Sequence, residues 1–256
     1  MPETILETKG LTRRFGGLTA VDAVDMVMRP GELVGLIGPN GAGKSTFFNC
    51  LTGFYPPSEG EVRFLDKPIT GLKPFQVAKM GIGRTFQNLR IMPNMTVFDN
   101  VSIGAIGSLG HSLRRALWPF NCLTDNEISQ RTWDILARVG LDSLSSELAA
   151  NLSYGKRKYL EIARALATDP KLLILDEPAA GLNEQETEQL ADFIQKLNRE
   201  GLPILLVEHD MGLVMGICQR VMVLALGKKI ADDTPEAVQQ HPLVLEAYLG
   251  GEECQY

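Results

Sequence analysis

Residues 38–46, GPNGAGKST, combine the residue types that bind the phosphates of a nucleotide. They fit the pattern G-x-x-x-x-G-K-[ST], between an apolar strand-like run, LVGLI, and a run that favours a helix. Gly41 and Gly43 allow backbone N–H groups to surround phosphate oxygens, where the helix N-terminus adds its positive dipole end. We expect Lys44 to neutralise the β and γ oxygens and the Ser45 hydroxyl to bind Mg²⁺. The stretch therefore predicts a phosphate loop made of Gly38, Pro39, Asn40, Gly41, Ala42, Gly43, Lys44, Ser45 and Thr46.

Two other interpretations of this stretch fit less well. An ordinary turn with an exposed lysine does not explain why the pattern stands between a strand and a helix. A Rossmann dinucleotide site needs glycines in the order G-x-G-x-x-G, which GPNGAG does not have.

Two acidic residues follow a second apolar run, LLILDEP. Asp176 and Glu177 stand at its C-terminal end, where ligands of open parallel sheets bind. Adjacent side chains that leave a strand point to opposite sides. We therefore expect Asp176 to serve the Mg²⁺ shell and Glu177 to face the water that attacks the γ-phosphate. The alternative is a solvated turn in which Pro178 only ends the strand, and a phosphate loop in the same chain argues against it.

Two further polar residues follow strand-like runs. His209 follows PILLVE, and its position at the same strand edge as Glu177 favours a role in the site over an ordinary surface position. Gln87 follows a short run in GRTFQNLR, where its amide could bind Mg²⁺ or a water molecule. The residue pattern alone does not single out Gln87.

The stretch from Leu152 to Lys156, LSYGK, has the composition of an anion site at the start of a helix. Ser153 is a good N-cap residue, and the helix predicted from about Lys156 offers free N–H groups and a positive dipole end. Arg157 and Lys158 add positive charge directly afterwards. We therefore expect a negatively charged ligand at this helix start.

The elements that position these residues are predicted from changes in periodicity. Residues 5–65 are mainly short β-like runs, with one helix after the phosphate loop. Residues 92–150 are helical in pattern, and a capping box of Thr124 and Glu127 predicts the start of one helix. After Lys156, helices alternate with buried strands, which indicates βαβ units and a parallel sheet.

Composition limits the classes of protein that this chain can be. The 256 residues include 25 Lys+Arg and 31 Asp+Glu, for a net charge of -6, so there is no overall basic field for nucleic acid or an anionic membrane. The 4 cysteines form no C-x-x-C pair, and the first ten residues resemble no signal segment, so we expect a reducing compartment. Apolar runs are far shorter than the roughly 20 residues that span a bilayer.

The order of these motifs along the chain resembles the ATP-binding subunit of ABC transporters. The phosphate loop is followed by Gln87, by the 152–156 stretch, by Asp176 with Glu177, and by His209. The resemblance extends over nearly the whole chain. It departs from the usual signature Leu-Ser-Gly-Gly-Gln at its third and fifth residues, which are tyrosine and lysine here.

The resemblance implies an α/β P-loop NTPase fold with a parallel-sheet core, an antiparallel β flank and an inserted helical subdomain. It implies a single domain over residues 1–256. The core and β flank would take about residues 1–91 and 156–256, and the helical subdomain with the signature about residues 92–155.

The resemblance also implies site roles and a head-to-tail dimer that hydrolyses ATP with Mg²⁺. Phe15 would stack on adenine, and Asn183 would lie at the contact between subunits, where an aspartate is common. The implied Mg²⁺ ligands are Ser45, Gln87 and Asp176. The implied catalytic residues are Lys44, Gln87, Glu177 and His209. The residues implied to bind the ATP of the opposite subunit are Leu152, Ser153, Tyr154, Gly155 and Lys156.

Several stretches are closer to one subfamily, the ATPase of high-affinity branched-chain amino-acid importers, the LivG/BraF type. They are RRFGGLTAV, RTFQNLRIMPNMTVFDNV, PAAGLN and the ending from EHDMGLVMGI to PEAVQQHPLVLEAYLG. This resemblance implies two permease subunits, an external binding protein and a peripheral position on the cytoplasmic face of the membrane. Related urea or amide importers, and lipid or lipopolysaccharide exporters, are alternatives. A soluble ABC ATPase that acts on nucleic acid or ribosomes fits less well.

Residues 107–122, GSLGHSLRRALWPFNC, place aromatic and apolar side chains beside two arginines. Such a composition is compatible with a membrane surface or a permease contact. Packing within the helical subdomain, with a solvated basic edge, is the interpretation we prefer.

Overall fold

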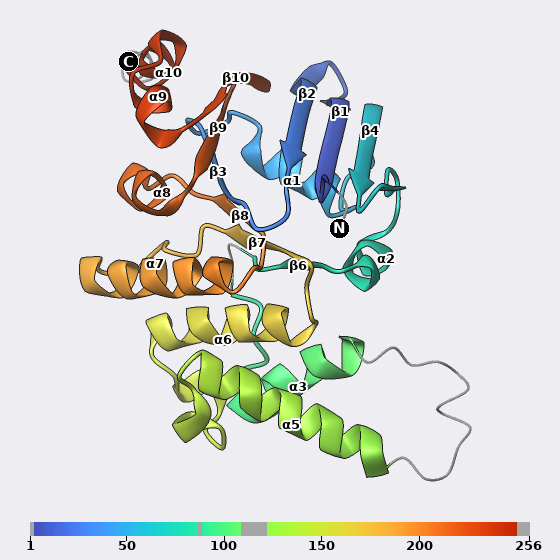
Figure 1. The fold of residues 1–256 in the computed structure, drawn as a ribbon, viewed down its shortest axis with the longest axis vertical. Helices are drawn as coiled ribbons and strands as arrows, with labels where there is room; N and C mark the ends of the chain where they lie inside the picture. Colours follow the sequence, from blue (N-terminus) through green and yellow to red (C-terminus); the bar gives the residue numbers. More distant parts are fainter. Residues whose placement is uncertain (1–2, 87–88, 109–121, 250–256) are drawn as a thin grey trace.

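The computed structural model describes residues 3–86, 89–108 and 122–249 of the chain. A six-stranded sheet with the strand order β10-β9-β3-β8-β7-β6 forms its centre (Figure 1). All neighbouring pairs are parallel except β10 and β9, which are antiparallel. The strands are β3 (Leu33–Ile37), β6 (Ile82–Arg84), β7 (Leu172–Asp176), β8 (Ile204–Val207), β9 (Arg220–Ala225) and β10 (Lys228–Asp233). The predicted parallel-sheet core is confirmed.

The parallel strands are mostly apolar, as expected for strands that are buried on both faces, and their charged residues stand at the strand ends. In β7 all residues are buried, and successive side chains enter two different cores. Leu173 and Leu175 pack with the helices on one face of the sheet. Leu172 and Ile174 pack with the antiparallel sheet on the other face. The sheet is therefore fixed between two layers, and the residues at its C-terminal edge are held in register.

The antiparallel β flank predicted from residues 5–65 is confirmed as a second sheet with the order β2-β1-β4-β5. Helix α1 (Lys44–Leu51) packs into the same core as both sheets, with Phe47 and Phe48 fully buried. This packing fixes the helix whose first residues belong to the phosphate loop. The strands are β1 (Leu6–Phe15), β2 (Leu18–Met28), β4 (Glu59–Phe64) and β5 (Lys67–Pro68).

Helices cover the face of the central sheet that is opposite to the antiparallel sheet (Figure 1). Helix α6 lies between α7 and the pair α3 and α5, and it packs against both members of that pair. The predicted subdomain boundary near residue 155 therefore falls in the first turn of α6. The helices are α3 (Val97–Ser108), α5 (Cys122–Arg138), α6 (Tyr154–Ala167), α7 (Glu184–Arg199) and α8 (Met211–Ile217).

Two predicted helix starts are wrong. Helix α5 begins at Cys122, so Thr124 stands inside the first turn and the predicted capping box with Glu127 does not start the helix. Residues 122–124 contain no proline or glycine, so the sequence does not prevent the helix from starting before Thr124. Helix α6 begins at Tyr154, two residues before the start predicted at about Lys156, and the predicted N-cap, Ser153, is confirmed.

The remaining elements connect these layers. A proline at the first helical position and the Thr234 hydroxyl, which accepts from the Ala237 N–H at 3.4 Å, start α9 as the sequence predicts. Within the described ranges, no helix is both long and apolar enough to span a bilayer. The remaining helices are α2 (Pro74–Met80), α9 (Pro235–Gln239) and α10 (Pro242–Leu249), with short 3-10 turns η1 (Asp142–Leu144) and η2 (Ala149–Asn151).

Candidate functional site

The motifs predicted from the sequence meet at the C-terminal edge of the parallel sheet. In the sheet register, Val207 of β8 pairs with Leu36 of β3 on one side and with Asp176 of β7 on the other. Adjacent strands lie about 4.8 Å apart. The phosphate loop after β3, the carboxylates after β7 and His209 after β8 therefore leave the sheet side by side. Such an edge is where ligands of open α/β sheets bind.

Two glycines of the phosphate loop are required by close backbone approaches. A Cβ at Gly38, which has φ +152°, would lie 2.1 Å from the carbonyl oxygen of Leu224 in β9. A Cβ at Gly43, which has φ +99°, would lie 2.3 Å from the carbonyl oxygen of Ala20 in β2. Strands of both sheets thus confine the loop, and these positions need φ values that favour glycine. The loop conformation is therefore set by the surrounding backbone.

Lys44 is the first residue of α1, and its side chain turns back into the loop. Its Nζ donates to the carbonyl oxygens of Gly38 at 2.6 Å and Pro39 at 3.2 Å. Burial lowers the pKa of Lys44, and the charge of the nearby Glu177 carboxylate acts in the opposite direction. A cation is thus placed at the mouth of the loop, while Ser45, the next residue, is exposed.

Asp176 and Glu177 have different environments, as the sequence predicts for two carboxylates that leave a strand together. Asp176 is 6% exposed, and its Oδ2 lies 3.5 Å from the Arg84 guanidinium. Glu177 is partly exposed and has φ +46°, so the chain leaves the strand conformation at this residue. Two hydrogen bonds hold that turn: the Glu177 N–H donates to Val207 O at 2.8 Å, and the Lys158 side chain donates through Nζ to Glu177 O at 3.2 Å. The Glu177 carboxylate is therefore presented from a fixed backbone.

His209 lies beside two carboxylates. Its Nδ1 is 3.9 Å from Glu177 Oε2 and 3.7 Å from Glu208 Oε2, and its side chain is 60% exposed. Glu208 is fully buried, and its carboxylate accepts from the N–H of Ala179 at 2.8 Å and of His209 at 3.1 Å. Burial raises the pKa of Glu208, and its backbone N–H donors oppose that shift. Glu208 therefore connects the turn after Glu177 with the turn that carries His209.

The start of α6 contacts the loop that follows Glu177 in the same chain. Ser153 caps the helix, with the Lys156 N–H 3.5 Å from its hydroxyl. The Tyr154 hydroxyl donates to Ala180 O at 3.1 Å. The Tyr154 ring packs so closely on Gly181 that a Cβ at that glycine would lie 2.9 Å from a ring carbon. The tyrosine in the third signature position is thus a link between the signature and this loop. Lys156 is exposed.

Other predicted site residues have structural neighbours. Asn183 is the N-cap of α7: its Oδ1 accepts from the Glu186 N–H at 2.9 Å, and Glu186 Oε2 accepts from the Asn183 N–H at 3.1 Å. Phe15 is 39% exposed at the end of β1 and packs edge-on against Tyr55 with ring centroids 5.3 Å apart. Gln87 lies outside the described residues, as do residues 109–121 of the predicted insertion.

Two charged residues of this site, Arg84 and Glu208, were missed by the sequence analysis. Arg84 bonds Asp176, 92 residues away, and Glu208 bonds Ala179, 29 residues away, so spacing does not reveal these pairs. Lys158, which the sequence placed among the cations at the start of α6, is instead 2% exposed and donates to Glu177 O. Among the described residues, no group of three or more His, Cys, Asp or Glu is arranged to hold a metal ion.

A layered α/β fold with a phosphate loop and adjacent carboxylates at one sheet edge defines a nucleotide-binding protein. The family model "ABC transporter" matches residues 21–180, and "Branched-chain amino acid ATP-binding cassette transporter" matches residues 228–254. The chain belongs to the ABC transporter family and is an ATPase of that family.

Relatives and solved structures agree with this assignment. The chain is 45% identical over 253 residues, 98% of this chain and 99% of the relative, to the high-affinity branched-chain amino acid transport ATP-binding protein LivG of Escherichia coli K12. An ABC transporter cassette solved in its ADP conformation has 33% identity and a TM-score of 0.85, over 96% and 99% of the two chains. A dimeric cassette bound to ADP and Pi after hydrolysis has 25% identity and a TM-score of 0.76, over 90% and 99%.

Proposed function

We propose that this chain binds and hydrolyses ATP to energise the import of branched-chain amino acids through a separate membrane permease. The observation that carries the proposal is the 45% identity with LivG over 98% of the chain. The match of residues 228–254 to a branched-chain amino acid family model supports the same cargo. We place the protein on the cytoplasmic face of the membrane, as a peripheral subunit bound to the permease. The permease and an external binding protein would select the cargo.

In the proposed site, the phosphate loop binds the phosphates and Phe15 stacks on adenine. Lys44 neutralises the β and γ oxygens, as its Nζ already lies inside the loop. Glu177 accepts a proton from the attacking water, and His209, whose Nδ1 is 3.9 Å from that carboxylate, contacts the γ-phosphate. Positioning and charge stabilisation supply most of the catalysis in phosphoryl transfer.

The donors that we assign to Mg²⁺ are all oxygens. They are the Ser45 hydroxyl, the Asp176 carboxylate and the amide of Gln87. Mg²⁺ is commonly bound through one or two carboxylates together with phosphates and water. Asp176, at the buried end of β7, fits that chemistry. The ion would neutralise charge on the transferred phosphoryl group.

We propose a head-to-tail dimer in which each signature stretch binds the ATP of the other subunit. The related dimeric cassette, with a TM-score of 0.76, supports a dimer. Ser153 and Lys156 are exposed at the start of α6, where a helix terminus favours an anion. The partner would be a second ABC ATPase subunit, identical or homologous.

Replacing Lys156 with glutamine tests this surface. If Lys156 faces the phosphates of the opposite subunit, loss of its charge weakens ATP-driven dimerisation by about fivefold, or about 1 kcal/mol. Sedimentation velocity with a non-hydrolysable ATP analogue measures the effect, which we expect to be larger at low salt. Lys67→Gln removes an exposed charge from β5 and serves as the matched control. If Lys156→Gln dimerises as strongly as Lys67→Gln, Lys156 does not lie at the interface.

The cargo is tested in vesicles that contain the co-purified permease and an enclosed or added binding protein. We expect ATP-dependent uptake of labelled leucine, isoleucine or valine, and no uptake with the Glu177→Gln subunit. Uptake of urea or a short amide instead would contradict the proposed cargo and leave the ATPase assignment intact. Co-purification with nucleic acid or ribosomes and not with a permease would contradict the transport function itself.

A further inference from the structure

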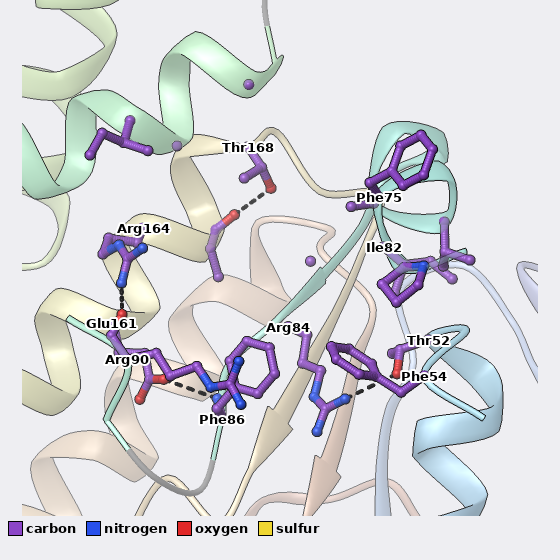
Figure 2. Close-up of a pocket in the computed structure, with 18 residues that line it drawn as sticks. Thr52, Phe54, Phe75, Ile82, Arg84, Phe86, Arg90, Glu161, Arg164 and Thr168 are labelled. Carbon is purple, nitrogen blue, oxygen red and sulfur yellow. Dashed lines mark hydrogen bonds between the residues drawn. The ribbon is translucent and has the colours of Figure 1, made fainter. Parts of the chain in front are cut away.

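Arg84, the last residue of β6, has an unusual environment for a charged side chain. Its guanidinium carbon lies 4.5 Å from the ring centroid of Phe48, 4.9 Å from that of Phe54 and 4.5 Å from that of Phe86. Figure 2 shows the side chain between the rings of Phe54 and Phe86. All three residues line a groove of about 460 Å³. Two aromatic rings from α1 and the turn after it, and a third from the chain just after β6, thus surround the guanidinium.

The side-chain partners of Arg84 lie in two elements, α1 with its C-cap residue and β7. Nη1 donates to Asn49 Oδ1 of α1 at 2.8 Å and to the Thr52 hydroxyl, at the end of that helix, at 3.1 Å. Nε donates to Thr85 O at 3.3 Å. Nη2 donates to Asp176 Oδ2 of β7 at 3.5 Å. The planar guanidinium therefore joins β7 to the C-terminal end of α1, and a lysine has no equivalent fork.

This connection links two groups that we assign to Mg²⁺. Helix α1 begins in the phosphate loop with Lys44 and Ser45, and Asp176 provides the carboxylate. Asp176 is 6% exposed, and a carboxylate at such a buried position requires polar partners. The contact of 3.5 Å is long for a charge-assisted hydrogen bond, so Arg84 orients Asp176 without the short bidentate contact that would compete strongly with a cation.

We propose that Arg84 is a positioning residue of the metal site, which sets the orientation of Asp176 relative to α1 so that the Mg²⁺ complex of the nucleotide binds. This inference rests on the proposed role of Asp176. Arg84 should affect metal binding more than nucleotide binding, because its bonds to described residues go to Thr85, Asn49, Thr52 and Asp176 and not to the phosphate loop.

The experiment measures metal and nucleotide binding separately. Mn²⁺ replaces Mg²⁺, and electron paramagnetic resonance titration gives its affinity for the complex with a non-hydrolysable ATP analogue. For Arg84→Gln we expect that affinity to fall by about tenfold, since residues that orient a metal ligand have effects of this size. Binding of the analogue in EDTA should change by less than about twofold. Arg84→Lys should lose nearly as much, because it keeps the charge and loses the fork.

The control variant is Arg90→Gln, which removes a guanidinium that also lines this groove and stacks on Phe86 at 4.4 Å. It should bind Mn²⁺ as the wild type does. Full Mn²⁺ affinity in Arg84→Gln, or full rescue by Arg84→Lys, would overturn the positioning role. Asp176→Asn distinguishes the proposed metal ligand from the positioning role of Arg84. If Asp176→Asn binds Mn²⁺ with normal affinity, Asp176 is not a metal ligand and the proposed site fails. If Asp176→Asn loses affinity while the Arg84 variants keep it, the metal ligand stands and the positioning role fails.

Discussion

Replacing Glu177 with glutamine is expected to lower ATP turnover by about 10²- to 10⁴-fold, the contribution of a general base. The amide has the same shape and cannot take a proton from water. The backbone at Glu177 is held by Val207 O and Lys158 Nζ, so the substitution changes the chemistry and not the position of the group. ATP affinity should be kept or increased, because a negative charge is lost near the phosphates and Lys44.

Phosphate release gives the turnover, and titration with a fluorescent ATP analogue gives the affinity. Glu61→Gln in β4 makes the same chemical change at an exposed carboxylate and should leave both values unchanged. Normal turnover in Glu177→Gln would exclude Glu177 as the base. Loss of both turnover and ATP binding would indicate a structural defect, which a thermal unfolding scan of the unliganded variant would detect.

The parts of the site that could be predicted from the sequence are those in which chemistry is encoded by local spacing. The phosphate loop needs glycines, a lysine and a hydroxyl at fixed offsets, so residues 38–46 identify it without a partner elsewhere in the chain. Asp176 and Glu177 follow an apolar run whose end marks the sheet edge. The parallel register then brings these local motifs together, since Val207 pairs with both neighbouring strands.

The parts that could not be predicted depend on contacts between distant segments. Tyr154 differs from the usual glycine of the signature, and only the fold shows that its hydroxyl meets Ala180 O. Glu208 is hidden within an apolar strand sequence, and its partner Ala179 lies 29 residues earlier. Both links end on the loop after Glu177. The position of that loop therefore depends on α6, which belongs to the helical layers, as well as on β8 of the core.

This arrangement has a consequence for how the two ATP sites of a dimer interact. The signature of one subunit would contact the ATP of the other subunit, and Tyr154 and Lys158 of the same helix bond the loop of their own Glu177. A displacement of α6 caused by one ATP would therefore act on the carboxylate of the second site.

Lys44→Ala is expected to have the largest effect on nucleotide binding, because it removes the cation inside the phosphate loop. A charge-assisted hydrogen bond contributes about 1.5–3 kcal/mol, so the loss of contacts to both β and γ oxygens should weaken ATP binding by about 10²- to 10⁴-fold. The unliganded protein should not lose stability. Burial lowers the pKa of Lys44, so the folded loop holds this charge less favourably than water does, and the nearby Glu177 carboxylate only partly offsets that cost.

Thermal unfolding distinguishes these two effects for Lys44→Ala in one measurement. ATP at about 100 times the wild-type dissociation constant should stabilise the wild type by about 2.7 kcal/mol and the variant hardly at all. Lys228→Ala is the matched control: it removes a lysine paired with Asp22 at 3.5 Å, beside the turn whose Gly227 N–H donates to Ala42 O of the loop. Because that lysine is exposed and pairs with Asp22 and not with the loop carbonyls, the control should respond to ATP as the wild type does. An equal ATP response of Lys44→Ala would mean that the backbone N–H groups and the α1 dipole alone bind the phosphates, and Lys44 would have no role in affinity.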